Sequence, residues 1–133
     1  MPKKQLSQSA FLLITQFALG SLCLIIVSGA LVRLTGSGLG CIDWPGCSQT
    51  RFVDVSTGHS AIEQINRLFT GVVSAAVVAS ALGSFFVKSR NRSMIWLSIG
   101  LVIGVLTQVL LGAVVVLTGL NPWSNMAHFL VSL

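Results

Sequence analysis

Apolar residues occur along this chain in long blocks that carry no charged side chain. The blocks cover residues 11–32, 68–87 and 93–133. A helix that crosses a membrane needs about 20 such residues, so the last block has room for two helices. Residues 118–122 read Thr-Gly-Leu-Asn-Pro, a composition typical of a turn, and we expect them to separate those two helices.

This pattern predicts an all-α integral membrane protein, folded as an antiparallel four-helix transmembrane bundle. We expect helices at about residues 10–33, 60–87, 93–117 and 124–133, with residues 34–59 forming an outer loop. The fourth helix would be about 16 Å long at about 1.5 Å per residue, against a hydrocarbon core of about 30 Å. We therefore expect residues 1–133 to be a single transmembrane domain, truncated in its fourth helix, within a longer protein.

Composition and charge support a membrane location. Only 8% of the residues are charged, against about 25% in soluble domains, and 53% are hydrophobic. The net charge is +5, but the basic residues are scattered at the ends of the apolar blocks, as topology signals are, and this argues against nucleic-acid binding. The positive-inside rule predicts a cytoplasmic N-terminus and a cytoplasmic connection between the second and third helices, from Lys3, Lys4, Lys88, Arg90 and Arg92.

A short internal repeat closes the first and third expected helices. Residues 29–36 read GALVRLTG and residues 112–119 read GAVVVLTG, which are identical at six of eight positions. This predicts two helical hairpins in the same orientation, related by an axis along the membrane normal. The alternative is chance similarity between two helices rich in valine, leucine and glycine.

Small residues recur every fourth position on the second and third expected helices. Such stripes allow the backbones of neighbouring helices to approach closely, and they can also make room for a flat ligand. We expect close packing along two stripes, Gly71, Ala75, Ala79 and Gly83, and Gly100, Gly104, Gln108 and Gly112.

An acid and a base stand near the outer start of the second helix. Glu63 and Arg67 have the i,i+4 spacing and order that favour an ion pair. Ser60 precedes Glu63 by three residues, the spacing of a capping box. Ionisable groups at membrane depth are often functional, so catalysis by Glu63 is a third alternative, which the spacing alone ranks below the other two.

The two histidines, His59 and His128, lie near the outer ends of the second and fourth helices. Because the repeat makes these helices equivalent, the two imidazoles can face each other and hold a haem iron from both sides. Taken singly, each is better explained as an ordinary histidine at a helix end. Three arginines on the same side can pair with haem propionates or with lipid head groups: Arg33, Arg51 and Arg67.

Two cysteines, Cys41 and Cys47, bracket a short segment of the outer loop. On the oxidising side of a membrane they can form a disulfide, as a structural staple or as a redox-sensitive bridge. Cys23 lies within the first helix, where we expect a small buried apolar residue.

Three stretches together resemble the haem A synthase family (Cox15/CtaA). They are GALVRLTGSGLGCIDWPGC at residues 29–47, IEQINRLFTG at residues 62–71 and LLGAVVVLTGLNPWSNMAHFLVSL at residues 110–133. Members of this family usually have eight helices in two similar halves, and the chain resembles the N-terminal half. The resemblance implies a multi-pass protein of the bacterial plasma membrane.

The resemblance also implies an activity. The family oxidises the C8 methyl group of haem O to a formyl group, giving haem A for terminal oxidases. It implies haem O as the substrate in this half, haem b as a cofactor in the other half, iron bound by His128 and His59, and Glu63 in the reaction. Haem contacts are implied for Arg67, Arg33 and Asn66, and the partners implied are haem O synthase, an electron donor and a second copy of the chain.

One residue departs from the pattern of the family. The motif Glu-x-x-His-Arg has Asn66 at its histidine position, and an amide is a poor haem ligand. The chain resembles an actinobacterial-like variant in which asparagine follows the glutamate and a histidine lies upstream, here His59. Two other functions remain open: a haem-binding electron-transfer cytochrome, and a non-catalytic assembly module or truncated product.

Overall fold

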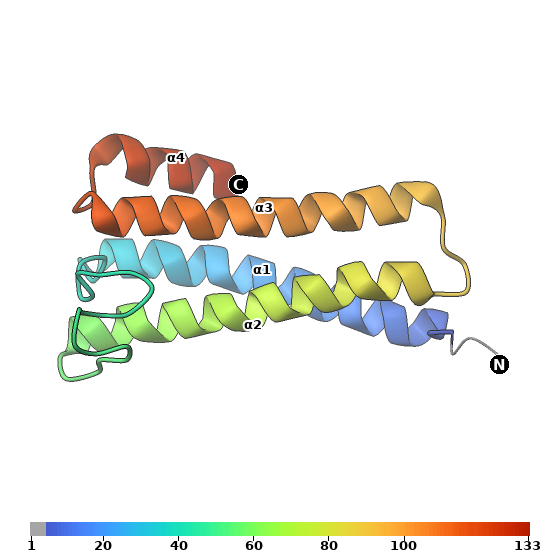
Figure 1. Cartoon of the computed structure of the whole chain (residues 1–133), viewed down its shortest axis with the longest axis horizontal. Helices are drawn as coiled ribbons and strands as arrows, with labels where there is room; N and C mark the ends of the chain where they lie inside the picture. The colour runs from blue at the N-terminus through green and yellow to red at the C-terminus, as the bar shows by residue number, and fades with distance from the viewer. Residues whose placement is uncertain (1–4) are drawn as a thin grey trace.

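The computed structural model describes residues 5–133, which form four helices (Figure 1). These are α1 (Gln8–Leu34), α2 (Gly58–Phe86), α3 (Arg92–Leu117) and α4 (Pro122–Ser132). Every helix end lies within two residues of its expected position. Residues 5–133 contain no β-strand, beyond an isolated bridge between Leu6 and Val87. The prediction of an all-α protein is confirmed.

Each helix begins at a polar residue whose side chain accepts a hydrogen bond from the first turn. These N-cap residues are Ser7, Thr57, Asn91 and Asn121, and they satisfy backbone N–H groups that have no partner inside the helix. The capping box of α2 joins Thr57 to Ser60. The expected box between Ser60 and Glu63 is therefore wrong, because the helix starts two residues earlier and Glu63 lies beyond its first turn.

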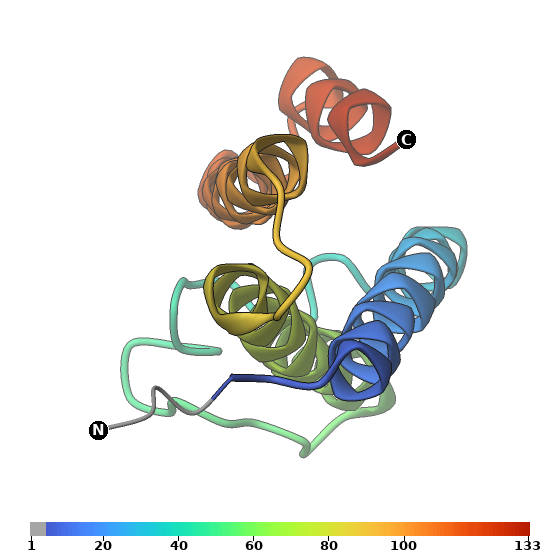
Figure 2. The same ribbon diagram turned by 90° about the vertical axis from the view of Figure 1, so that its right-hand side faces the viewer.

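The helices pack in chain order and run antiparallel to their neighbours. α1 lies against α2, α2 against α3 and α3 against α4, and Figure 2 shows α4 on the far side of α3 from α2. α1, α2 and α3 are long and apolar enough to cross a membrane. Large apolar side chains such as Leu13 and Leu97 are well exposed, as expected for surfaces that face lipid. The chain is a multi-pass membrane protein.

The small-residue stripes contact neighbouring helices at their ends. A Cβ at Gly83 would meet Phe11 of α1 at 3.0 Å, and one at Gly112 would meet His128 of α4 at 3.5 Å. Within the described part of the chain, a Cβ at Gly71, Gly100 or Gly104 would meet nothing within 4 Å. The expectation of close helix packing is therefore confirmed at Gly83 and Gly112. It is wrong at Gly71, Gly100 and Gly104.

The internal repeat is a repeated helix ending. Gly36 and Gly119 both adopt positive φ, 67° and 62°, a conformation that glycine adopts without strain. Two matching backbone bonds follow: Ser37 N–H donates to the Val32 carbonyl and Leu120 N–H to that of Val115, each at 2.9 Å. The predicted hairpins thus leave α1 and α3 through the same turn. This end of the molecule, which carries residues 35–57 and 118–121, is called the loop end below.

Candidate functional site

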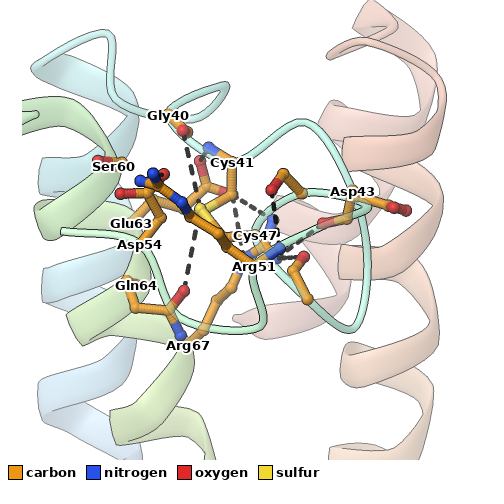
Figure 3. Close-up of a disulfide and its surroundings, with 12 residues drawn as sticks. Gly40, Cys41, Asp43, Cys47, Arg51, Asp54, Ser60, Glu63, Gln64 and Arg67 are labelled. Atoms are coloured by element: carbon orange, nitrogen blue, oxygen red, sulfur yellow. Dashed lines mark hydrogen bonds and ion pairs between the residues drawn. A yellow bond between two sulfur atoms is a disulfide. The ribbon is translucent and has the colours of Figure 1, made fainter. Parts of the chain in front are cut away.

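A disulfide joins Cys41 and Cys47 in the connection between α1 and α2 (Figure 3). Residues 35–57 are called the disulfide loop below. Both cysteines are buried, and the Cys41 sulfur lies 3.8 Å from the amide oxygen of Gln64, a buried residue of α2. A backbone bond from Ile42 N–H to the Cys47 carbonyl, 3.0 Å, closes the same small ring. The bridge therefore shapes the part of the loop that rests on α2.

Glu63 and Arg67 of α2 form a buried ion pair directly beneath this ring. The distance from Arg67 Nη2 to Glu63 Oε1 is 2.6 Å, and the two side chains are 15% and 6% exposed. Glu63 Oε2 accepts the backbone N–H of Cys41 at 2.9 Å. Arg67 Nη1 donates to the carbonyls of Asp43 and Gly46, at 2.8 and 3.0 Å. The pair thus holds the ring closed by the bridge at three backbone positions, those of Cys41, Asp43 and Gly46, and Figure 3 shows Glu63 and Arg67 beside this ring.

Gly40 brings the loop backbone against the first turn of α2. A Cβ at this position would overlap the backbone carbonyl of His59 and lie 2.6 Å from the backbone nitrogen of Ser60. Such distances are not possible for real side chains, so only glycine fits here without a shift of backbone. The glycine before Cys41 is therefore required by the contact between the loop and the helix.

His59 and Asn66 each contact a serine: His59 contacts one that follows α1, and Asn66 contacts one within α1. His59 is exposed, and its Nδ1 lies 3.0 Å from the hydroxyl oxygen of Ser37. Ser28 of α1 donates a hydrogen bond of 2.8 Å to Asn66 Oδ1. Both side chains are thus turned toward the α1 side of α2, where a spacing of seven residues puts them on one helical face.

His128 and Gln108 lie on the facing surfaces of α4 and α3. The ring of His128 sits over Gly112, where an added Cβ would be 3.8 Å from Nε2. Gln108 is one turn away from Gly112 on the same side of α3. Within residues 5–133, the buried side-chain nitrogen and oxygen atoms that lack a hydrogen-bond partner are Gln108 Nε2, Gln108 Oε1 and His128 Nδ1. All of these unpartnered atoms therefore belong to one pair of helices.

The two histidines lie at different distances from the starts of their helices. His59 is the second residue of α2, counted from Gly58, whereas His128 is the seventh of α4, counted from Pro122. At about 1.5 Å per residue, His128 is about 7 Å further from its helix start. Asn66 is the ninth residue of α2, so its distance from the helix start is closer to that of His128 than that of His59 is.

Three other candidate residues are on the surface. Arg33 is exposed in the last turn of α1, and Arg51 lies 3.5 Å from the carboxylate of Asp54, with its side chain 61% exposed. Hydrogen bonds from the side chain and the backbone N–H of Ser56 hold the pKa of Asp54 below its usual value. Cys23 is a free, exposed thiol, so the expectation that it is buried is wrong. The helix turns this residue to the outside.

Gln108 is the candidate that the sequence reasoning missed. Its four-residue spacing from Gly104 and Gly112 predicts only a place in the small-residue stripe, although glutamine is not small. The signal was present, because Gln108 is the one amide side chain in the stretch from 93 to 117. A polar amide in the middle of an apolar helix needs a partner, and polar residues in such segments commonly mark functional positions.

Known proteins provide a comparison for this arrangement. The model of the COX15-CtaA family, described as cytochrome oxidase assembly protein, matches residues 10–61. A heme A synthase of Bacillus pumilus is 38% identical over 112 residues, which are 83% of this chain and 36% of that protein. A heme A synthase of Listeria welshimeri is 34% identical over 112 residues, 82% of this chain and 36% of that protein. One of Lysinibacillus sphaericus is 34% identical over 111 residues, with 83% and 36% covered.

These relatives match most of this chain, and the chain spans only 36% of their length. The family model covers α1 from residue 10, the whole disulfide loop and the first residues of α2. That segment includes Gly40, the bridged cysteines Cys41 and Cys47, and the first copy of the repeated helix ending. The chain therefore belongs to the COX15-CtaA family.

Proposed function

We propose that this chain is the haem-binding N-terminal half of a haem A synthase, which oxidises the C8 methyl group of haem O to a formyl group. The support is the name carried by its relatives, heme A synthase, together with a helical membrane fold. The chain spans 36% of those proteins, so the activity belongs to the proposal. We further propose that the protein lies in a bacterial plasma membrane with its N-terminus in the cytoplasm and the disulfide loop outside.

The single observation that carries the proposal is the set of unpartnered polar atoms between α3 and α4. A buried polar atom without a hydrogen bond costs about 1–3 kcal/mol, so such atoms are expected to have a partner in the working protein. His128 Nδ1 and the Gln108 amide are atoms of this kind. Imidazole is a ligand of haem iron, and the ring of His128 lies against Gly112, which itself carries no side chain. The donor set thus fits a haem.

The other residues of the site have separate roles. His128 is the residue that would hold the iron, and His59 and Asn66, on the α1 side of α2, are the other residues of this chain that would contact the haem. Arg33, exposed in the last turn of α1, is the cation suited to a haem propionate. Arg67 already gives its donors to Glu63, Asp43 and Gly46, so its proposed role is to hold the disulfide loop and not to bind a propionate.

Glu63 acts in this proposal as a positioning residue. Both of its carboxylate oxygens are engaged, one by Arg67 and one by the N–H of Cys41, so the side chain fixes the loop over the loop end of the helices. The loop then shields that end from water. The haem iron, when bound, supplies the redox chemistry, while the residues of this chain bind and orient the macrocycle. Haem b in the remaining part of the protein, haem O synthase as the source of substrate, and an electron-transfer partner complete the proposal.

The test is to express the complete protein beside a haem O synthase and to extract the haems. We expect haem A in the parent and its loss in His128→Ala. Met126→Ala is the matched control, because Met126 is on the same helix and 45% exposed. If the parent makes no haem A, or His128→Ala makes as much as the parent, the proposal is wrong.

One observation favours a second function, that of an electron-transfer cytochrome. All three hydrogen bonds that Glu63 accepts come from Arg67 or from the N–H of Cys41, an arrangement that suits a structural role. A haem-binding protein that only carries electrons needs no carboxylate for proton transfer. The same extraction separates the two functions: an electron carrier shows a reversible haem spectrum that depends on His128 and leaves the haem type unchanged.

A further inference from the structure

The disulfide loop carries a group of apolar side chains on its outer surface. Residues that would ordinarily be buried are instead exposed: Ile42 is 73% exposed, Phe52 67%, Val55 61% and Val53 49%, with Trp44 at 37%. These five residues are called the apolar loop patch below. An exposed apolar group of this kind marks an interaction surface.

The fold prevents this patch from turning inward. The loop is held to α2 by the disulfide, by the Glu63–Arg67 pair and by the contact at Gly40. Those contacts occupy its inner side, and they leave the side chains of Ile42 and Phe52 outward. The patch therefore needs a partner outside the loop.

The position of the loop indicates what that partner is. The loop joins the ends of α1 and α2, two helices able to cross a membrane, so it lies at the level where the bilayer ends. Figure 2 shows it extending sideways past α2 and away from α4. Trp123, at the start of α4 on the same end of the molecule, is 75% exposed. Tryptophan and other aromatic side chains are enriched at this level of membrane proteins.

The polar residues of the loop suit the same location. Arg51 and Asp54 pair with each other on either side of Phe52 and Val53 in the sequence, so these exposed apolar residues are flanked by charged ones. The charges of the disulfide loop nearly cancel, because the loop has one basic residue, Arg51, and two acidic residues, Asp43 and Asp54. The apolar surface, and not a charge-specific head group, therefore dominates the interaction.

We propose that the apolar loop patch inserts into the boundary between head groups and acyl chains of the phospholipid bilayer and holds the disulfide loop against the membrane surface. Phe52, Val53 and Val55 enter the boundary, Trp44 lies at its edge, and Arg51 reaches back to the head groups. This inference does not depend on the proposed haem chemistry.

The test uses Trp44 as a reporter of lipid contact. The chain with Trp96→Phe and Trp123→Phe keeps one tryptophan and is placed in phosphatidylcholine nanodiscs whose acyl chains are brominated near the head group or near the chain end. We expect Trp44 to lose most of its emission to the shallow bromines and less to the deep ones. Quenching by aqueous iodide without quenching by bromines overturns the proposal, and so does protection from both, which would mean that protein covers the patch.

Matched variants test whether the patch causes the contact. Phe52→Asp and Val55→Asp each place a charge in the patch, and we expect bromine quenching of Trp44 to fall sharply in both. Gln49→Asp adds the same charge at an exposed loop residue outside the patch, and quenching should stay at the parent level. An intact disulfide, measured by mass, confirms that the loop is still folded. If the patch variants behave as Gln49→Asp does, the proposal is wrong.

Discussion

The two hairpins of this chain share one helix ending and use their buried polar groups in opposite ways. In the α1–α2 hairpin, Glu63 and Arg67 pair with each other, and their other side-chain hydrogen bonds go to the disulfide loop. In the α3–α4 hairpin, Gln108 and His128 have buried polar atoms that find no partner among residues 5–133. The buried ion pair of the first hairpin thus has its hydrogen-bond partners within that hairpin, whereas the second hairpin contains buried polar atoms that lack hydrogen-bond partners among the described residues.

The difference begins immediately after the shared turn. The hydroxyl of Thr35 lies 2.9 Å from that of Ser37, which in turn contacts His59 at the start of α2. The equivalent Thr118 lies 3.1 Å from Ser124 in the first turn of α4. One turn therefore leads into a long loop that is folded against its hairpin, and the other leads directly into a helix that presents His128. The repeat therefore supplies a common scaffold, which is followed in one copy by a loop folded against its hairpin and in the other by a helix that carries His128.

The largest expected effect comes from breaking the ion pair of the first hairpin. Glu63→Ala leaves the Arg67 guanidinium buried without its partner, which costs about 3–5 kcal/mol. Unfolding in detergent, followed by helical circular dichroism, should show this loss, and proteolysis should cut within residues 41–57. Arg67→Ala should cost a similar amount, and the double variant should cost less than the sum of both. Additive costs would mean that the two side chains are not coupled to each other, and an unchanged cleavage pattern would mean that they do not hold the loop.

A smaller effect is expected from the loop contact at Gly40. Gly40→Ala forces the loop away from the backbone of His59 and Ser60, and overpacking of this kind costs about 1–3 kcal/mol. Gly58→Ala is the matched control, since a Cβ there meets nothing within 4 Å among the described residues. Thermal unfolding of the two variants in detergent measures the difference. Equal midpoints for the two variants would show that the loop does not rest on α2 at Gly40.

In the second hairpin, replacing Gln108 should raise the stability of the haem-free protein and lower its affinity for haem. Gln108→Leu removes a buried amide without a partner, so the haem-free protein should gain about 1 kcal/mol of stability. If Gln108 meets a ligand, the same change should weaken haem binding by roughly fivefold, which corresponds to about 1 kcal/mol. Haem titration followed by absorbance gives the second value.

Thr107→Val is the control for this pair of measurements. Thr107 is the exposed neighbour of Gln108, and its hydroxyl donates to the Ile103 carbonyl within α3. We expect it to change neither the stability of the haem-free protein nor haem binding by a comparable amount. A Gln108→Leu variant that loses stability without haem would remove the contrast between the two hairpins.

The sequence predicted the helices well because the length of an apolar block sets the length of a membrane span. It also indicated the Cys41–Cys47 bridge and the i,i+4 pair of Glu63 and Arg67, since both depend on local spacing. The way in which that pair grips the loop could not be predicted, because the carbonyls of Asp43 and Gly46 are about twenty residues away and carry no side-chain signal. The five-residue difference between the positions of His59 and His128 in their helices follows equally from the expected starts at residues 60 and 124, because both of those starts lie two residues late.

The smallest expected effect is the response of the protein to low pH, which we expect in the first hairpin and not in the second. All three side-chain carboxylates of the chain, Asp43, Asp54 and Glu63, belong to the first hairpin. Hydrogen bonds from Ser56 lower the pKa of Asp54 from its reference value of 3.8. The stabilisation of the loop by these bonds is therefore present above that reference value and is lost as the pH falls through the lower pKa of the folded loop. The amide resonance of Ser56 should shift at the low end of an acid titration, and Asp54→Asn should abolish this shift while resonances of α3 and α4 stay unchanged in both proteins. An identical titration of Ser56 in Asp54→Asn would assign the acid response to another carboxylate of the first hairpin.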